Sequence, residues 1–220
     1  MKIAAKGSPE RLAELGLILS SAGLNYIGLE STKNIDSHEY DLVFDLNFDD
    51  DPHSLSDYLK ASGSKTFFLL SGVKMQIESA VPRQLWQKVV FINALPGFLG
   101  RKSIEYCTLS DSFDASVFSS IGWMDANKTA SRVGMVSPRV VFMIINEAYY
   151  TLQEGTASRN DIDQGMKLGT AYPLGPFEWC DKVGLKNVYE TLSAIYDDTH
   201  DERYRICSML KTEYLSLQNK

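Results

Sequence analysis

The segment from residue 137 to residue 194 constrains the fold most, because glycines and prolines divide it into helices. Ser137 and Pro138 are residue types favoured at a helix start, and apolar side chains follow at helical spacing. Gly155 suits the left-handed conformation that often ends a helix, and Ser158 suits the start of a second one. This segment therefore predicts a series of short helices joined by tight turns.

A turn rich in proline separates this pair of helices from the next pair. Pro173 and Pro176 each disfavour helix in the residue before them, and Pro176 suits the first position of a third helix. That helix is expected to end near Gly184, before a further helix that carries Val188 and Leu192. The pattern predicts an all-helical domain over residues 121–220.

Many short motifs occur in a fixed order along this segment. They are Asn146-Glu147-Ala148, Glu154-Gly155, Ala157, Asp161-Ile162-Asp163, Met166, Leu168-Gly169, Pro173, Gly175-Pro176, Glu178, Asp181 and Gly184-Leu185. The run resembles the C-terminal domain of the 3-hydroxyacyl-CoA dehydrogenase family. Most of the matched residues are glycines, prolines and helix-end residues, so the resemblance indicates fold more directly than chemistry.

Composition limits the classes of partner. The chain has 220 residues, of which 44% are hydrophobic and 23% charged, as in globular proteins. Its formal net charge of -6 argues against a nucleic acid or an anionic membrane surface as the main partner. No apolar run is long enough to span a membrane, and we expect the first residues to lead into a strand and not to form a signal peptide.

The cysteines and histidines predict neither disulfides nor a metal site. The 3 cysteines are widely spaced and odd in number, as expected of free thiols in a reducing cytoplasm. The 3 histidines show no metal-ligand spacing with them. We therefore expect a cytoplasmic protein without a bound metal.

The first part of the chain alternates apolar runs with a helical pattern. The runs read as strands, and they are residues 2–5, 25–29, 41–46, 66–70 and 89–92. Strand, helix, strand is the opening of a nucleotide-binding α/β unit. We expect a shortened, Rossmann-like parallel sheet of five or six strands over residues 1–120, so that the whole fold is α/β followed by all-α.

The resemblance implies NAD as a cofactor, but the expected phosphate loop is altered. Where the family has G-x-G-x-x-G after the first strand, Gly7 takes the first glycine position, while Pro9 and Leu12 take the other two. Proline offers no amide proton and leucine adds bulk, so both oppose close approach of a pyrophosphate. Glu30 stands where an acidic residue would hold the ribose, and Asp45 takes the place of the glutamate in the family's third-strand motif A-D-L-V-I-E-A. We expect NAD binding to be weak or absent.

An acidic stretch, NFDDDPH at residues 47–53, follows the third strand. Its aspartates, proline and the following serine are typical of a solvated loop before a helix start. A cation site is the alternative, although the stretch lacks the spacing of a known calcium loop.

The resemblance also locates the expected catalytic residues. In the family the fifth strand ends in a histidine that takes the proton of the substrate hydroxyl, and a glutamate twelve residues later orients it. Here Asn93 and Glu105 occupy those positions. An amide cannot accept the proton, because it has no useful pKa. Ser71 keeps the serine that follows the family's fourth strand, and Pro138 replaces the asparagine that binds the substrate carbonyl.

Two functions remain open, and with them the question whether the chain is an enzyme. One is an active NAD-dependent 3-hydroxyacyl-CoA or 3-hydroxybutyryl-CoA dehydrogenase with a substituted base. Tyr106 is then the nearest candidate, although an ordinary tyrosine pKa of about 10 makes it a poor base. The other is a pseudoenzyme of fatty acyl-CoA metabolism, which holds an acyl-CoA or a partner without hydride transfer.

The resemblance implies a homodimer through the helical domain. The segment 137–154 is more apolar than a solvent-exposed helix needs to be. It can be the dimer interface, the central helix of the domain core, or both. We expect the interface to lie within residues 137–200, with the sheet domain outside it.

Overall fold

A computed structural model describes residues 1–33, 39–60 and 65–218. The chain divides into two compact units, Met1–Met135 and Val136–Lys220. The first unit extends beyond the boundary expected near residue 120, because the strand Asp125–Lys128 belongs to its sheet.

The first unit is built on one sheet, which has seven strands within the described residues. They are β1 (Ile3–Lys6), β2 (Ile27–Gly28), β3 (Leu42–Asp45), β4 (Phe67–Ser71), β5 (Val89–Ile92), β6 (Ser103–Thr108) and β7 (Asp125–Lys128). Their order is β2-β1-β3-β4-β5-β6-β7, and the first five pair in parallel. β6 runs antiparallel to β5, and β7 runs parallel to β6. The five strands predicted from sequence are confirmed, whereas β6 and β7 were not predicted.

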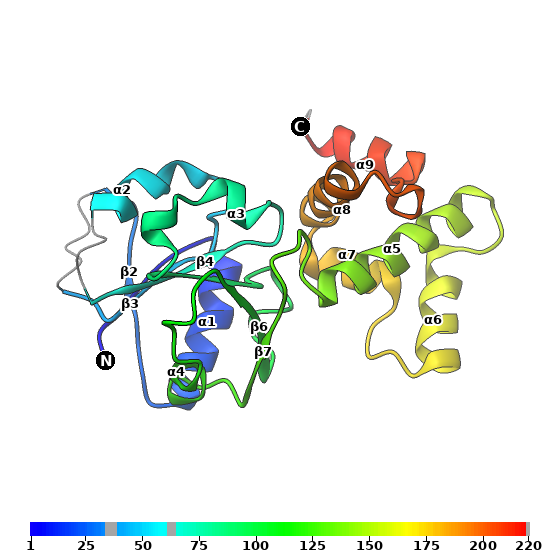
Figure 1. The fold of residues 1–220 in the computed structure, drawn as a ribbon. Coiled ribbons are helices and arrows are strands. Elements are labelled where there is room, and N and C mark those ends of the chain that lie inside the picture. Colours follow the sequence, from blue (N-terminus) through cyan, green and yellow to red (C-terminus); the bar gives the residue numbers. More distant parts are fainter. Residues whose placement is uncertain (34–38, 61–64, 219–220) are drawn as a thin grey trace. The chain divides into compact units, whose positions relative to one another are not determined.

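Helices cover both faces of this sheet, which explains the apolar strands. Figure 1 shows α1 (Pro9–Ser21) and α4 (Ser116–Ser120) on one face, with α2 (Leu55–Lys60) and α3 (Ile77–Ala80) on the other. Side chains alternate between the two layers along β4. Phe68 packs against Tyr58 of α2 with ring centroids 4.6 Å apart, while Leu69 lies in the core cluster of α1 and α4.

The second unit is entirely helical in its described residues. It contains α5 (Ser137–Gln153), α6 (Arg159–Thr170), α7 (Pro176–Val183), α8 (Leu185–Thr199), α9 (Ser208–Gln218) and the 3-10 turn η3 (Glu202–Tyr204). The predicted joints are confirmed: Gly155 has a φ of 71°, the Ser158 hydroxyl accepts from the Asp161 amide, and Pro176 begins α7. The start of α5 differs slightly from the expectation, since Ser137 is its first residue and Val136 takes the N-cap position.

Several motif residues around α7 take part in one contact, between Asp163 and the start of that helix. The Asp163 carboxylate accepts hydrogen bonds from the first amides of α7, at 2.8 Å from Phe177 N and 3.2 Å from Glu178 N. A Cβ atom on Gly175 would lie 2.3 Å from the Asp163 side chain, so only glycine fits there. Asp163 thus supplies a negative charge to the N-terminus of α7 and ties α6 to it.

Asn146 has a comparable role in the middle of α5. It is buried, its Nδ2 donates to Arg205 O at 3.0 Å, and its Oδ1 accepts from Cys207 N at 2.9 Å. These bonds fasten α5 to the segment that precedes α9. Phe142 is also fully buried, so α5 is a core helix of this unit. Within the described residues, no helix combines the length and apolarity needed to cross a membrane.

We expect Gly175→Ala to destabilise the helical unit by about 2 kcal/mol, because the added methyl must displace the Asp163 carboxylate from the start of α7. Denaturant unfolding followed by circular dichroism measures the change. Gly165→Ala is the matched control, since Gly165 lies within α6 with nothing near its added methyl, and alanine favours helix. Equal stability of the two variants would contradict this role of Gly175.

Candidate functional site

The candidate site lies at the carboxyl ends of the parallel strands, where open α/β sheets bind ligands. Gly7 follows β1, while Asp45 ends β3 and Ser71 ends β4. Asn93 follows β5, and Glu105 lies on β6. The topology therefore brings most of the predicted site residues to one edge of the sheet.

Asn93 and Glu105 face each other across the β5–β6 pair. The Asn93 backbone amide donates to Glu105 O at 3.0 Å, and its side-chain Nδ2 lies 3.5 Å from Glu105 Oε2. The Asn93 Oδ1 accepts from Leu95 N at 3.4 Å. The two residues that the resemblance pairs are thus close together, and one of them is an amide where the family has an imidazole.

Ser71 lies beside this pair on the neighbouring strand. It is paired with Ile92, the residue before Asn93, and it is fully buried. Its Oγ makes no hydrogen bond to any described residue. Pro138 belongs to the helical unit, where it is the buried second residue of α5. Its ring supports the helix start and supplies no hydrogen-bond donor.

Tyr106 does not share the side of the sheet that Glu105 occupies. Successive residues of a strand point to opposite faces. The Tyr106 ring packs in the core, with its centroid 5.0 Å from that of Phe118 and 6.3 Å from that of Phe113. The structure therefore argues against Tyr106 as the substituted base.

The loop after β1 does not fit the pyrophosphate of a dinucleotide. A Cβ atom on Gly7 would lie 2.9 Å from Leu46 Cβ. The glycine therefore leaves room for the Leu46 side chain and not for a ligand. The Ser8 amide, which could otherwise face a phosphate, donates to Asn47 Oδ1 at 2.7 Å. Pro9 is the first residue of α1 and has no amide proton to donate. Leu12 packs against the core.

Asp45 is used within the fold. Its Oδ2 accepts from Ser54 Oγ at 2.9 Å and from Tyr58 OH at 2.7 Å, and Lys6 Nζ lies 3.5 Å away. The carboxylate thus fastens α2 to the end of β3. Burial, followed by the charge of Asp45, raises the pKa of Tyr58 above its ordinary value.

Glu30 is exposed after β2 and lines a cavity of about 530 Å³. The cavity is also lined by Lys6, Gly7, Ser8, Leu29, Asn47, Asp50 and Asp51. The structure therefore brings Glu30 and Gly7, the two positions that the resemblance assigns to the cofactor, to one cavity. Its three carboxylates outnumber its one ammonium group, which disfavours an anionic ligand.

The acidic stretch 47–53 is not the solvated loop expected from its composition. The Asp49 side chain is fully buried, and its Oδ2 accepts from Val73 N at 3.0 Å and from Lys74 N at 3.4 Å. Phe48 is also buried. The expected helix start after this stretch is confirmed, since the 3-10 turn η1 (Pro52–Ser54) leads into α2.

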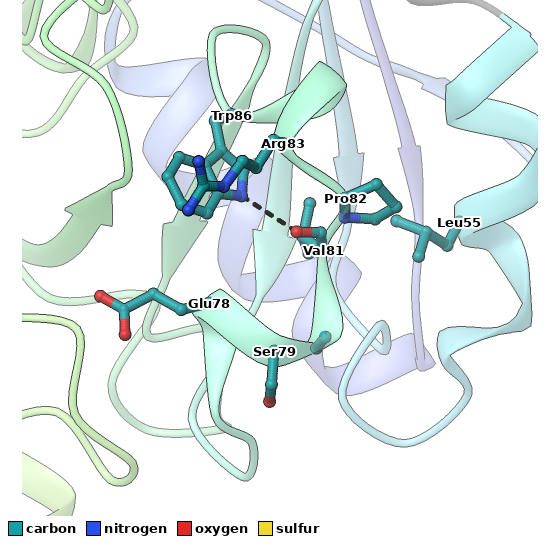
Figure 2. Close-up of a pocket in the computed structure, with 8 residues that line it drawn as sticks. Leu55, Glu78, Ser79, Val81, Pro82, Arg83 and Trp86 are labelled. Atoms are coloured by element: carbon teal, nitrogen blue, oxygen red, sulfur yellow. Dashed lines mark hydrogen bonds between the residues drawn. The ribbon is translucent and has the colours of Figure 1, made fainter.

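A second hollow, of about 570 Å³, is lined by Leu55, by α3 and by the residues around the 3-10 turn η2 (Arg83–Leu85). Figure 2 shows Arg83 stacked on the indole ring of Trp86, whose Nε1 donates to Val81 O at 2.9 Å. This hollow shares no lining residue with the strand-end site.

Comparison with known proteins identifies the helical unit. Residues 134–218 match the model of the 3-hydroxyacyl-CoA dehydrogenase C-terminal domain. The helical unit belongs to the 3-hydroxyacyl-CoA dehydrogenase family. The resemblance stated from the sequence motifs is thereby confirmed.

Two curated relatives each match less than half of the chain. A 3-hydroxyadipyl-CoA dehydrogenase of Escherichia coli is 44% identical over 82 residues, which cover 37% of this chain and 17% of that protein. A probable 3-hydroxybutyryl-CoA dehydrogenase of Bacillus subtilis is 39% identical over 88 residues, covering 38% and 31%. The matched segments thus span less than a third of either relative.

The likeness of fold extends over the whole chain. A crystal structure of (S)-3-hydroxybutyryl-CoA dehydrogenase from Ralstonia eutropha superimposes with a TM-score of 0.77 at 18% sequence identity. The match covers 98% of this chain and 93% of that one. The mainly parallel sheet followed by helices is therefore the 3-hydroxyacyl-CoA dehydrogenase fold, as the sequence predicts.

The sequence reading missed one residue at the site, Arg11, although α1 carries a signal for it. Arg11 lies on the same helix stripe as Leu15, Ile18 and Leu19, all of which are buried. A basic residue at a core position must find a partner. Its partners are in the acidic stretch 47–53, far along the chain.

We expect Tyr58→Phe to lower the free energy of unfolding by about 2 kcal/mol at neutral pH, because a buried hydrogen bond to the Asp45 carboxylate is lost. The raised pKa of Tyr58 means that the fold favours its neutral form. This contribution is fully present below the unfolded pKa of about 10 and is lost as pH rises further.

The wild type should therefore lose more stability than Tyr58→Phe above pH ~10. Denaturant unfolding at neutral and alkaline pH measures both effects. Tyr172→Phe is the control, since this half-buried tyrosine makes no described hydrogen bond through its hydroxyl. Parallel alkaline curves for the wild type and Tyr58→Phe would argue against the role of Tyr58.

Proposed function

We propose that this chain is a 3-hydroxyacyl-CoA dehydrogenase-like protein that has lost hydride transfer. It acts as a dimeric binding protein in fatty acyl-CoA metabolism. One observation carries the proposal, namely that Asn93 stands against Glu105 where the family's acid–base pair is expected.

The chemistry of the amide supports this loss. Oxidation of a hydroxyl by hydride transfer releases a proton, which a base must accept. Asn93 can donate and accept hydrogen bonds but cannot take up that proton. Pro138 supports the same proposal, because it takes the position of the asparagine that the resemblance implies, and proline cannot provide that side-chain hydrogen bond.

The cofactor loop supports the same conclusion. The Ser8 amide donates to Asn47, and the space beside Gly7 contains Leu46. Binding of NAD would have to displace contacts that already satisfy these groups. The residues present do not fit a dinucleotide, so NAD binding is weak or absent.

An acyl-CoA remains a suitable ligand for the groups that are left. The Asn93 amide and the Ser71 hydroxyl can each donate to the carbonyl oxygen of a thioester. The Ser71 Oγ lacks a hydrogen-bond partner among the described residues, so a carbonyl oxygen would satisfy it. Binding by hydrogen bonds alone requires neither a proton acceptor nor a cofactor.

Active dehydrogenation is the second candidate, and the intact Asn93–Glu105 contact favours it. Glu105 is itself a carboxylate and could accept a proton in place of the missing imidazole. The two candidates differ in one measurable quantity, which is turnover with NADH.

We expect turnover of acetoacetyl-CoA with NADH to be near background, because general acid–base catalysis typically supplies about 10²–10⁴-fold in rate and its base is missing. Asn93→His alone should not restore the rate, since Pro138 and the loop after β1 stay unchanged. The oxidation of NADH, followed by spectrophotometry, measures the rate of the purified wild type and of Asn93→His.

A calorimetric titration with NADH is the accompanying control, with acetoacetyl-CoA titrated separately. Weak or undetectable NADH binding together with measurable acyl-CoA binding supports the binding protein. A robust wild-type rate that falls with Glu105→Gln would establish the enzyme instead.

The exposed apolar residues of the helical unit support the homodimer. Val140 is 53% exposed on α5 and Leu168 is 83% exposed on α6, although both are apolar. Ile144 is half-buried one turn after Val140, on the same side of α5. Isologous pairing would cover such surfaces, and twofold dimers are the commonest closed assembly.

We expect Val140→Glu combined with Ile144→Glu to convert a stable homodimer into a folded monomer, because two charges would be buried at the interface. Light scattering at micromolar concentration measures the mass, and circular dichroism verifies the fold. Lys211→Glu, an exposed change on α9 outside residues 137–200, should leave the dimer intact.

Phe142 is a poor probe of the interface, because it is fully buried within its own unit and a charge there should unfold it. A wild-type protein that is a well-folded monomer at micromolar concentration would contradict the proposed dimer.

A further inference from the structure

Four charged side chains form a cluster where the ends of β1, β3 and β4 meet. Arg11 Nη2 lies 3.2 Å from Asp50 Oδ2, and Arg11 Nη1 lies 3.7 Å from Asp49 Oδ1. Lys74 Nζ lies 2.6 Å from Asp50 Oδ1. These side chains are almost entirely shielded from solvent, with exposed fractions between 0% and 15%.

The cluster occupies the part of this fold where a phosphate is normally received. In doubly wound sheets the phosphate sits at the turn after the first strand, against the N-terminus of the following helix. Here the Ser8 amide at that turn donates to Asn47, and Arg11 of the first turn of α1 also donates to Leu46 O. Both acceptors belong to the loop after β3.

The amides after β4 are occupied in the same way. Asp49 Oδ2 accepts from Val73 N and from Lys74 N. Two successive amides, a guanidinium group and an ammonium group form a typical anion-binding set. In this chain the anions are carboxylates of the chain itself.

We propose that Asp49 and Asp50 act as an internal anion, which fills a phosphate-type site and excludes a ligand phosphate from it. Two carboxylates neutralise two cations, so the site retains no net positive charge. A phosphate group would have to displace both carboxylates into solvent or share the cluster with them. The two carboxylates therefore oppose dinucleotide binding at this edge of the sheet, in addition to the replacement of the motif glycines by Pro9 and Leu12.

This proposal does not depend on the loss of hydride transfer, because it concerns the charge around α1 and not Asn93. It implies that the site can bind a foreign anion once the two negative charges are removed, since the two cations then lack counterions. Inorganic pyrophosphate is a suitable probe, because it contains the diphosphate group of the dinucleotide linkage without the nucleosides.

The experiment compares the wild type with the double variant Asp49→Asn, Asp50→Asn, in which each asparagine keeps an oxygen acceptor. In chloride the Tm of the double variant should fall by about 10 °C, because two buried cations lose their counterions. Pyrophosphate should raise it again in a saturable manner, by about 4 °C at ten times Kd. The wild type should show no such rise beyond a chloride control of equal ionic strength.

Two further variants make the result specific. Adding Arg11→Met to the double variant should abolish the effect of pyrophosphate, because the central cation is gone. Asp111→Asn removes a fully exposed carboxylate and should behave as the wild type. A pyrophosphate-dependent rise in the wild type, or a double variant that stays unfolded or unaffected in pyrophosphate, would overturn the proposal.

Discussion

The buried ion cluster of Arg11, Lys74, Asp49 and Asp50 joins segments that follow three different strands. α1 follows β1, the two aspartates follow β3, and Lys74 follows β4. Because β3 lies between β1 and β4 in the sheet, its loop can bond to both neighbours at once. Buried charges persist only when they are paired, so the loop is held in one conformation. The remainder of the strand-end site depends on that loop, since Leu46 lies against Gly7 and Asn47 accepts from the Ser8 amide.

The helical unit depends on a different type of contact, in which a polar side chain satisfies the backbone at a helix end. Asp163 accepts from the first amides of α7, and Asn146 bonds to backbone groups on both sides of residue 206. Such contacts explain why so many motif residues of this unit are architectural. They constrain how the helices join without specifying any chemistry, and this unit can therefore match its relatives closely although the residues expected to be catalytic differ.

Local sequence signals predicted most of the fold. Glycine and proline positions gave the helix joints of the second unit, and apolar runs gave the five parallel strands. β6 and β7 escaped prediction, because β7 is short and polar, with the sequence DANK, and is mostly exposed. The Asn93–Glu105 contact was expected from the family resemblance, in which these two positions carry the catalytic pair. The cluster around Arg11 was not expected, because its partners lie far apart in the chain and the acidic stretch has the composition of a solvated loop.

The strand-end site combines residues that keep their expected geometry with residues that no longer suit the expected chemistry. Glu105 still lies beside the position of the missing base, yet its neighbour is an amide. Two changes in different places would thus oppose hydride transfer, one by removing the proton acceptor and one by neutralising the cations near α1. They act independently, since the first affects the chemical step and the second affects binding of the cofactor. Restoring an imidazole at position 93 would leave the carboxylates of Asp49 and Asp50 in place. These two carboxylates would still oppose binding of the cofactor's phosphates near α1.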